Sequence, residues 1–130
     1  MPQRQDIIPE EMKIIHEKSR YTPGVRVGNL LYIAGQVGRD ADWNTIEGVE
    51  EQITKAFENV KLVLEEAGAS FDNIVDLRTY HTDVGHLPTV HKVKNSFFGE
   101  KVPAWTAVGV AALARPEWII EISAVAYLND

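Results

Sequence analysis

The feature that most constrains the fold is a stretch in which apolar residues recur at three- and four-residue steps between Val49 and Ala67. This spacing places the apolar side chains in one stripe along a helix of about five turns. Gly68 follows directly, at the position where a glycine commonly ends a helix. The stretch therefore predicts one long amphipathic helix that must bury its apolar face against another layer.

The segments around this helix are typical of β-strands, being apolar or alternating and bounded by turn residues. Pro88 predicts a second helix that ends near Phe98, before Gly99. The first ten residues are polar and are expected to be loose. The expected order is strand, strand, helix, strand, helix, strand, strand, with the strands at residues 12–18, 30–34, 74–82, 104–113 and 118–128.

This order predicts an α+β fold in which both helices cover one face of a mixed sheet. The other face of the sheet would then be left open, and oligomerisation is the simplest way to bury it. A length of 130 residues suits a single domain over residues 1–130, and 45% hydrophobic residues are enough for a core.

Charge and composition exclude several function classes. The net charge of −6 disfavours a nucleic-acid partner, because such binding depends on Lys and Arg that neutralise phosphates. The absence of cysteine excludes disulfides, thiolate nucleophiles and Cys-based zinc sites. No apolar run has the length of a signal peptide or reaches the roughly eighteen residues that cross a bilayer. We therefore expect a cytoplasmic protein without a membrane segment.

Metal and cofactor sites are not indicated. The histidines stand at positions 16, 81, 86 and 91, and no two of them have the four-residue spacing of a helical zinc motif. The glycines at positions 24, 28 and 35 are not gathered into a phosphate-binding or dinucleotide-binding loop. We expect neither a metal nor a cofactor.

Glu121 is the clearest chemical candidate, because it lies in the otherwise apolar stretch 118–126. Strand alternation places it on the face opposite Ile120 and Ile122. A desolvated carboxyl has a raised pKa, which suits acid–base catalysis near neutral pH. A solvated glutamate on an open strand face explains the same spacing, so spacing alone leaves both readings open. For His91 and Trp105, surface and packing roles are the ordinary interpretations.

Three segments together resemble the Rid/YjgF family over nearly the whole chain. They are YTPGVRVGNLLYIAGQ at residues 21–36, ENVKLVLEEAGASFDNIVDLRTYHTD at 58–83, and PAWTAVGVAALARPEWIIEISAVA at 103–126. The resemblance implies a chorismate-mutase-like fold and a homotrimer that binds small-molecule ligands in clefts between subunits. It also implies hydrolysis of reactive enamines and imines to ammonia and a 2-oxo acid, without a cofactor.

Three site positions keep the residue that the family has. Tyr21 matches the tyrosine of the cleft, Gly35 matches the glycine after the first strand of the family pattern, and Glu121 matches the glutamate that positions or activates water. The resemblance therefore implies that Glu121 is catalytic and that Tyr21 and Gly35 contact the substrate.

Four other cleft positions depart from the family pattern. Trp105 stands where the family has the arginine that holds the substrate carboxylate, and His91 stands where it has an asparagine. Ala34 and Ala107 replace a serine and a cysteine. An indole offers one neutral N–H instead of a charged bidentate fork, and the lost charge-assisted pair is worth about 1.5–3 kcal/mol. We therefore expect simple 2-imino acids to bind poorly.

The sequence leads to one main hypothesis and two alternatives. The main one is a cofactor-independent deaminase-type hydrolase of a small imine-like or enamine-like metabolite. In it Glu121 positions water, His91 is a second acid–base group or hydrogen-bond donor, and Trp105 and Tyr21 form aromatic walls. The first alternative is a non-catalytic trimer that binds a small molecule or a protein partner. A ribonuclease is the least favoured, because the chain is acidic and lacks a basic cluster.

Overall fold

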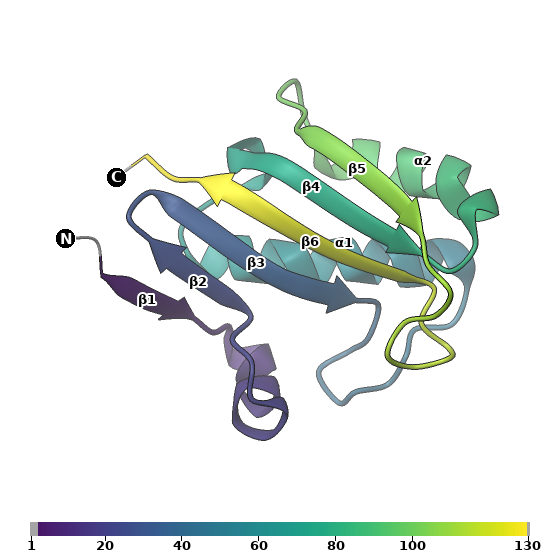
Figure 1. Ribbon diagram of the computed structural model, residues 1–130, viewed down its shortest axis with the longest axis horizontal. Coiled ribbons are helices and arrows are strands. Elements are labelled where there is room, and N and C mark those ends of the chain that lie inside the picture. The colour runs from purple at the N-terminus through teal and green to yellow at the C-terminus, as the bar shows by residue number, and fades with distance from the viewer. Residues whose placement is uncertain (1–2, 130) are drawn as a thin grey trace.

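A computed structural model describes residues 3–129 of the chain. It shows a twisted six-stranded sheet with both α-helices lying behind it (Figure 1). The fold is α+β, as predicted. The elements are β1 (Arg4–Ile7), β2 (Gly24–Val27), β3 (Leu30–Val37), α1 (Val49–Glu66), β4 (Ile74–His81), α2 (Leu87–Phe97), β5 (Ala104–Gly109) and β6 (Ile120–Tyr127).

The strands are ordered β1-β2-β3-β6-β4-β5 across the sheet. Every neighbouring pair is antiparallel except β4 and β5, which run parallel. The parallel pair follows from α2, because a helix between two strands returns the chain to the edge from which it started. The sheet is therefore mixed, and β6, the last strand of the chain, lies at its centre between β3 and β4.

The core lies between α1 and the inner face of the sheet. Phe57 and Val60 of α1, Leu31 of β3, and Ile120 and Ile122 of β6 are all fully buried. Burying an aliphatic or aromatic side chain of this size contributes about 1.5–3 kcal/mol, so this layer supplies much of the stability. The predicted alternation of β6 is confirmed, with its even-numbered residues 120–126 buried.

The end of α1 follows the prediction closely. Gly68 has a positive φ of 76°, and its N–H donates to the carbonyl of Glu65 at 3.0 Å. The N–H of Ala69 donates to the carbonyl of Leu64 at 2.8 Å. This pair of bonds is the Schellman motif, which satisfies carbonyls that the helix end leaves free. Within residues 3–129, neither α1 nor any other helix is long and apolar enough to cross a membrane.

The predicted edge strand at residues 12–18 is wrong. The loose segment expected over the first ten residues is wrong for β1, and residues 1 and 2 lie outside the described part of the chain. The chain forms β1 first, and then helical turns at Glu10–Met12 and Ile15–Ser19. Met12 and Ile15 are both buried. Their three-residue spacing is helical, and both side chains reach the core only if the backbone turns between them.

The C-terminal strands are shorter than predicted. β5 ends at Gly109 and β6 begins at Ile120, so residues 110–119 form a loop. In β4, Leu77 is buried as expected but Val75 is 49% exposed. The register of β4 against β6 shifts between Ile74 and Asp76, and this irregularity turns Val75 away from the core.

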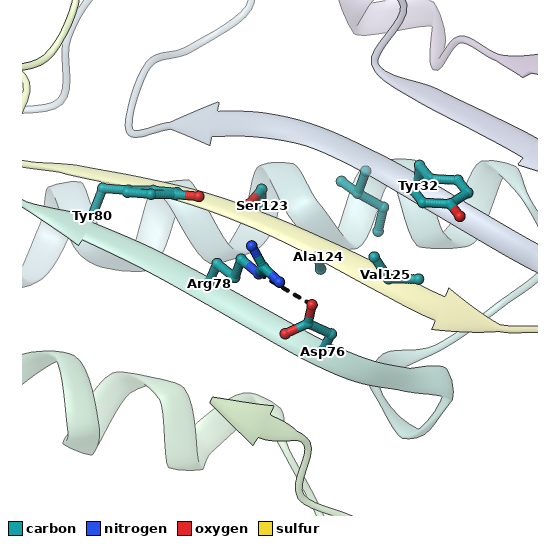
Figure 2. A pocket seen from close by; sticks show the side chains of 8 residues that line it. Tyr32, Asp76, Arg78, Tyr80, Ser123, Ala124 and Val125 are labelled. Carbon is teal, nitrogen blue, oxygen red and sulfur yellow. Dashed lines mark hydrogen bonds and ion pairs between the residues drawn. The ribbon is translucent and has the colours of Figure 1, made fainter. Parts of the chain in front are cut away.

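Among residues 3–129, no helix or further strand covers the outer face of the sheet. Figure 2 shows the side chains of Tyr32, Arg78, Tyr80 and Val125 on this face, where they line a hollow of about 330 Å³. Within the hollow, Nε of Arg78 lies 3.1 Å from a carboxylate oxygen of Asp76. An open face that carries tyrosines and valines is typical of a surface that another subunit covers.

The left-handed conformation at Gly68 gives a direct test of the fold. We expect Gly68→Ala to lower the free energy of unfolding by about 1 kcal/mol, because a Cβ at positive φ is strained. No neighbouring atom lies within 4 Å of that Cβ, so backbone strain alone is measured. Urea denaturation followed by circular dichroism gives the value. Gly99→Ala is the control, since Gly99 lacks a positive φ, and equal losses in both variants would contradict the assignment.

Candidate functional site

A cavity of about 440 Å³ opens where β3 ends and β6 begins. This volume lies within the range of small-molecule sites, about 300–1,000 Å³. Four of the residues predicted from the sequence line it together, namely Tyr21, Ala34, Gly35 and Glu121. They come from the segment before β2, from β3 and from β6, so the fold assembles the cavity from distant parts of the chain.

Glu121 lies on the outer face of β6, opposite Val37 of β3 and Tyr80 of β4. The register of β3 against β6 shifts between Ile33 and Gln36. A Cβ at Gly35, within this irregular stretch, would lie 2.8 Å from the carboxyl carbon of Glu121. Only glycine leaves room for the carboxyl group there. Burial raises the pKa of Glu121, which brings its titration closer to neutral pH.

Tyr21 stands between opposite charges at the cavity. Burial raises the pKa of its hydroxyl, the positive charge of Arg39 opposes that effect, and the negative charge of Glu121 adds to it. The hydroxyl therefore stays protonated at neutral pH and can donate a hydrogen bond to a ligand. The side chain remains partly open to solvent, with 41% of the residue exposed.

Two arginines and two tryptophans also line the cavity. We call them the arginine–tryptophan cluster: Arg39, Trp43, Arg115 and Trp118. The guanidinium carbon of Arg39 lies 4.3 Å from the Trp43 ring centroid, and that of Arg115 lies 5.7 Å from the same centroid. The Arg115 carbon also lies 5.6 Å from the Trp118 ring. These distances are typical of cation–π contacts, which hold both cations beside the cavity.

The loop between β3 and α1 is organised by Asp40. Its carboxylate accepts hydrogen bonds from the backbone N–H groups of Asp42 and Asn44, both at 2.9 Å. Trp43, inside this turn, has a positive φ of 69°. That conformation costs a non-glycine residue about 1–2 kcal/mol, and it persists where the surrounding contacts fix the backbone. The turn therefore determines where the Trp43 ring lies under Arg39.

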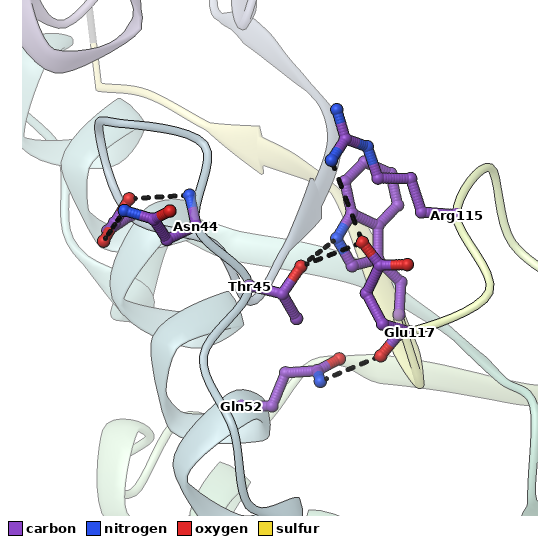
Figure 3. Close-up of polar contacts among 7 residues, drawn as sticks. Asn44, Thr45, Gln52, Arg115 and Glu117 are labelled. Atoms are coloured by element: carbon purple, nitrogen blue, oxygen red, sulfur yellow. Dashed lines mark hydrogen bonds and ion pairs between the residues drawn. The ribbon is translucent and has the colours of Figure 1, made fainter.

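The loop before β6 is tied to α1 and to the first loop (Figure 3). The buried side chain of Gln52 accepts from the N–H of Ile119 at 2.8 Å and donates to the carbonyls of Ile46 and Glu117, both at 3.2 Å. The indole N–H of Trp118 donates to the hydroxyl of Thr45 at 3.2 Å. Both loops of the cavity are thus fixed to the same helix.

Trp105 belongs to a second group of residues, at the β5 edge of the sheet. Its indole N–H donates to the hydroxyl of buried Thr79 at 3.0 Å, and that hydroxyl lies 2.7 Å from Nε2 of His81. Burial lowers the pKa of His81, so this histidine is neutral at pH 7. The amine of Lys94 lies 4.8 Å from the Trp105 ring centroid. The single donor of Trp105 is therefore already used within the chain.

His91 and Ala107 lie with Trp105 and not with Glu121. His91 is exposed on α2, and its ring centroid is 5.9 Å from that of Trp105. Ala107 is exposed on β5, two residues from Trp105 and therefore on the same face of the strand. Neither residue lines the cavity that contains Glu121. Within one chain, the seven predicted site residues thus form two separate groups.

The sequence reading missed the arginine–tryptophan cluster. Arg39 and Trp43 fall between the strand predicted at residues 30–34 and the long helix, and Arg115 falls between the last two predicted strands. Loop positions carry no periodicity, so no pattern marks a residue there as facing a cavity. The one available signal is composition, because an arginine and a tryptophan occur close together in both loops.

The cavity offers a carboxyl group, a phenol and two guanidinium groups, which suits proton transfer and anion binding. Among residues 3–129, no group of three or more His, Asp or Glu side chains is arranged to hold a metal ion. The partly buried carboxyl group of Glu121, with its raised pKa, supports acid–base chemistry on a polar ligand.

Comparison with known proteins identifies the class. The family described as Endoribonuclease L-PSP matches residues 12–128. The chain is 34% identical to the RutC family protein YjgH of Escherichia coli (strain K12), over 95% of this chain and 96% of that protein. The chain therefore belongs to the Rid/YjgF family. It is also 34% identical to the 2-iminobutanoate/2-iminopropanoate deaminase of Mus musculus, over 82% of this chain and 79% of the relative.

Solved structures agree with this assignment. Protein YjgH superposes with a TM-score of 0.89 at 33% identity, covering 98% of both chains. RidA from the Antarctic bacterium Psychrobacter sp. PAMC 21119 gives a TM-score of 0.80 at 35% identity, over 83% of this chain and 88% of the other. The fold predicted from the resemblance is thus confirmed.

The close approach of Gly35 to Glu121 predicts the effect of a methyl group. We expect Gly35→Ala to displace the Glu121 carboxyl group and to weaken ligand binding in the cavity by about tenfold or more, while the fold is retained. Calorimetry tests this with phenylpyruvate, an aromatic 2-oxo acid whose carboxylate and ring match the arginines and aromatic walls of the cavity. Circular dichroism checks that the fold is retained. Gly99→Ala again serves as control, because its Cβ would meet nothing closer than 3.9 Å.

Proposed function

We propose that this chain is a cofactor-independent hydrolase of a small reactive imine or enamine. The observation that carries the proposal is the partly buried carboxyl group of Glu121, whose pKa is raised, in a cavity that also contains Tyr21 and Gly35. These are the three positions at which the sequence keeps the family residues. Relatives described as 2-iminobutanoate/2-iminopropanoate deaminases support a reaction of this type.

The proposed reaction needs only water and one carboxylate. The substrate reacts as the protonated imine. Glu121 accepts a proton from a water molecule while the water oxygen bonds to the imine carbon, and the electrons of the C=N π bond move to nitrogen, which becomes a neutral amine. Glu121 then returns the proton to that nitrogen. As the C–N bond breaks, Glu121 takes the proton of the new hydroxyl group, ammonia leaves with the bonding electrons, and the hydroxyl carbon becomes the carbonyl of the product. An enamine enters the same sequence after it takes up a proton at carbon. The Tyr21 hydroxyl donates a hydrogen bond that orients the substrate.

The substrate is proposed to differ from the simplest 2-imino acids. Trp105 carries no charge, and its N–H already donates to Thr79. It can therefore contribute an apolar wall but not a bidentate clamp for a carboxylate. We assign His91, next to Trp105, as a second hydrogen-bond donor or acid–base group, and Ala34 and Ala107 as small residues that widen the site.

A homotrimer would bring the two groups of residues together. Glu121 and Tyr21 lie at the β3–β6 end of the sheet, whereas Trp105 and His91 lie at its β5 edge. One subunit can place its β5 edge against the cavity of the next if the open sheet faces pack around a threefold axis. The proposed ligand cleft then lies between subunits, with catalytic Glu121 from one chain and Trp105 from its neighbour.

The alternative of a non-catalytic binding protein is favoured by one observation. The arginine–tryptophan cluster supplies ligand contacts that do not depend on Glu121. In that case Glu121→Gln would leave function intact, whereas hydrolysis requires the carboxylate. A ribonuclease, which the family description names, is the least favoured function, because the chain carries a net charge of −6.

Ammonia release tests the proposed reaction. Imines are generated in situ from a panel of amino acids by an amino-acid oxidase, and 2-aminoacrylate is included. We expect hydrolysis of at least one imine, slow turnover of 2-iminopropanoate, and a loss of about a hundredfold or more in Glu121→Gln. Turnover that persists in Glu121→Gln would contradict the role of this residue, and no turnover of any imine would favour the binding protein.

The pH dependence follows from the raised pKa of Glu121. The active form is the carboxylate, so activity should rise with pH as Glu121 ionises. Burial raises the pKa of Glu121, so the midpoint of this rise in activity should lie above the ordinary glutamate value of 4.5. The residual activity of Glu121→Gln should not show this rise. The same rise of activity with pH in the wild type and in Glu121→Gln would show that another group titrates.

The proposed assembly has its own test. Light scattering should give three times the chain mass of 14.6 kDa for the wild type. Val125→Lys places a charge on the open sheet face, and we expect it to yield monomers that retain their secondary structure. Glu58→Lys, on the exposed side of α1, is the control and should remain trimeric. A monomeric wild type would exclude the intersubunit cleft.

A further inference from the structure

We propose that Arg39 and Arg115 form an anion-binding subsite within the cavity, and that it binds the carboxylate of the substrate in place of the clamp missing at Trp105. The statement that the bound anion is the substrate carboxylate rests on the proposed function. The statement that the two arginines bind an anion rests on the geometry alone. The subsite lies in the same cavity as Glu121, at the ends of the central strands β3 and β6, whereas Trp105 lies on the edge strand β5.

Arg39 holds a positive charge that the described chain does not neutralise. The residue is 5% exposed, and no carboxylate among residues 3–129 forms an ion pair with its guanidinium group. Its one protein hydrogen bond runs from Nη1 to the backbone carbonyl of Asp40, at 2.9 Å. A guanidinium group has five N–H donors, so most of its capacity is unused. A nearly buried cation in this state is suited to an anionic ligand.

Arg115 is held in place only weakly by other charges. Its Nη1 lies 3.8 Å from the carboxylate of Glu117, and both side chains are 47% exposed. An ion pair this long and this open to water contributes little. The guanidinium group can therefore turn toward a ligand in the cavity without breaking a strong interaction.

The two arginines approach each other although their charges repel. Both contact the same Trp43 ring, at 4.3 and 5.7 Å from its centroid. Burial lowers the pKa of Arg39, Tyr21 and Asp40 oppose that effect, and the positive charge of Arg115 adds to it. An anion between the two groups would remove this repulsion and would gain charge-assisted hydrogen bonds.

The subsite is preorganised, which raises the affinity that it can reach. Asp40 fixes the turn that carries Trp43, and Gln52 ties the segment after Arg115 to α1. A ligand therefore does not have to order these loops when it binds. The same two loops position both arginines relative to Glu121, so a carboxylate bound by them fixes the rest of the ligand near that residue.

The lining indicates the class of ligand. The cavity of about 440 Å³ has aromatic walls from Tyr21, Trp43 and Trp118. Flat apolar groups pack favourably on such walls. The ligand that fits is an imine with a carboxylate at one end and an aromatic side chain, larger than the short-chain imino acids that the family arginine holds.

Phenylpyruvate is the binding probe, because it is the stable carbonyl product of the phenylalanine-derived imine. Calorimetry on the full-length protein should show that Arg39→Gln and Arg115→Gln each weaken its binding by about tenfold or more. Arg39→Lys should retain part of the affinity. Arg4→Gln is the matched control, because Arg4 is exposed, pairs with Asp6 on β1 and does not line the cavity. It should bind as the wild type does.

Phenylacetone, which lacks the carboxylate, completes the test, since its binding should be the same in wild type and Arg115→Gln. If Arg39→Gln fails to fold, Arg115→Gln decides, because about half of the Arg115 side chain is open to solvent and its loss should not prevent folding. Unchanged phenylpyruvate affinity in Arg115→Gln, or no binding to the wild type, overturns the subsite. If phenylpyruvate binds through the arginines but no imine is hydrolysed, only the proposed reaction is refuted. If the wild type and Arg115→Gln hydrolyse imines equally well, only the subsite is refuted.

Discussion

The cavity depends on two buried amide side chains of α1. Asn59 donates to the backbone carbonyls of Val37 and Arg39, at 2.8 and 3.0 Å, where β3 ends. Gln52 bonds to the backbone of both loops at the same edge. A buried amide that loses its partners is costly, so these bonds strongly favour one loop arrangement. The packing of α1 on the sheet, which forms the core, thereby also determines the shape of the site.

The electrostatics of the cavity follow from this arrangement. Glu121 and Arg39 carry opposite charges but do not form an ion pair, and the Tyr21 hydroxyl is influenced by both. The carboxyl group therefore keeps a raised pKa instead of being stabilised as an anion, and the guanidinium group keeps its donors. Groups held apart in this way can act separately, one in proton transfer and the other in binding.

Sequence patterns predicted the parts of the fold in which side chains repeat. The stripe of α1 and the alternation of β6 each leave a periodic signal, and both elements are observed within two residues of their predicted bounds. The segment at residues 12–18 was misread because so short a run fits either period, and only burial of Met12 and Ile15 shows which one holds. Tyr21, Ala34, Gly35 and Glu121, which the resemblance groups together, line one cavity, and their roles in it stay predictions.

By itself, the sequence determined the family, the long helix and the central strand, and it predicted through the resemblance that Trp105 stands at the clamp position. These depend on residue types at fixed spacings along the chain. Only the tertiary structure decided that Trp105 donates to Thr79, away from Glu121, and that two arginines from separate loops meet at the Trp43 ring. Such contacts join positions far apart in the chain. They depend on how α1 fixes the loops, and a local sequence pattern does not predict contacts between distant segments.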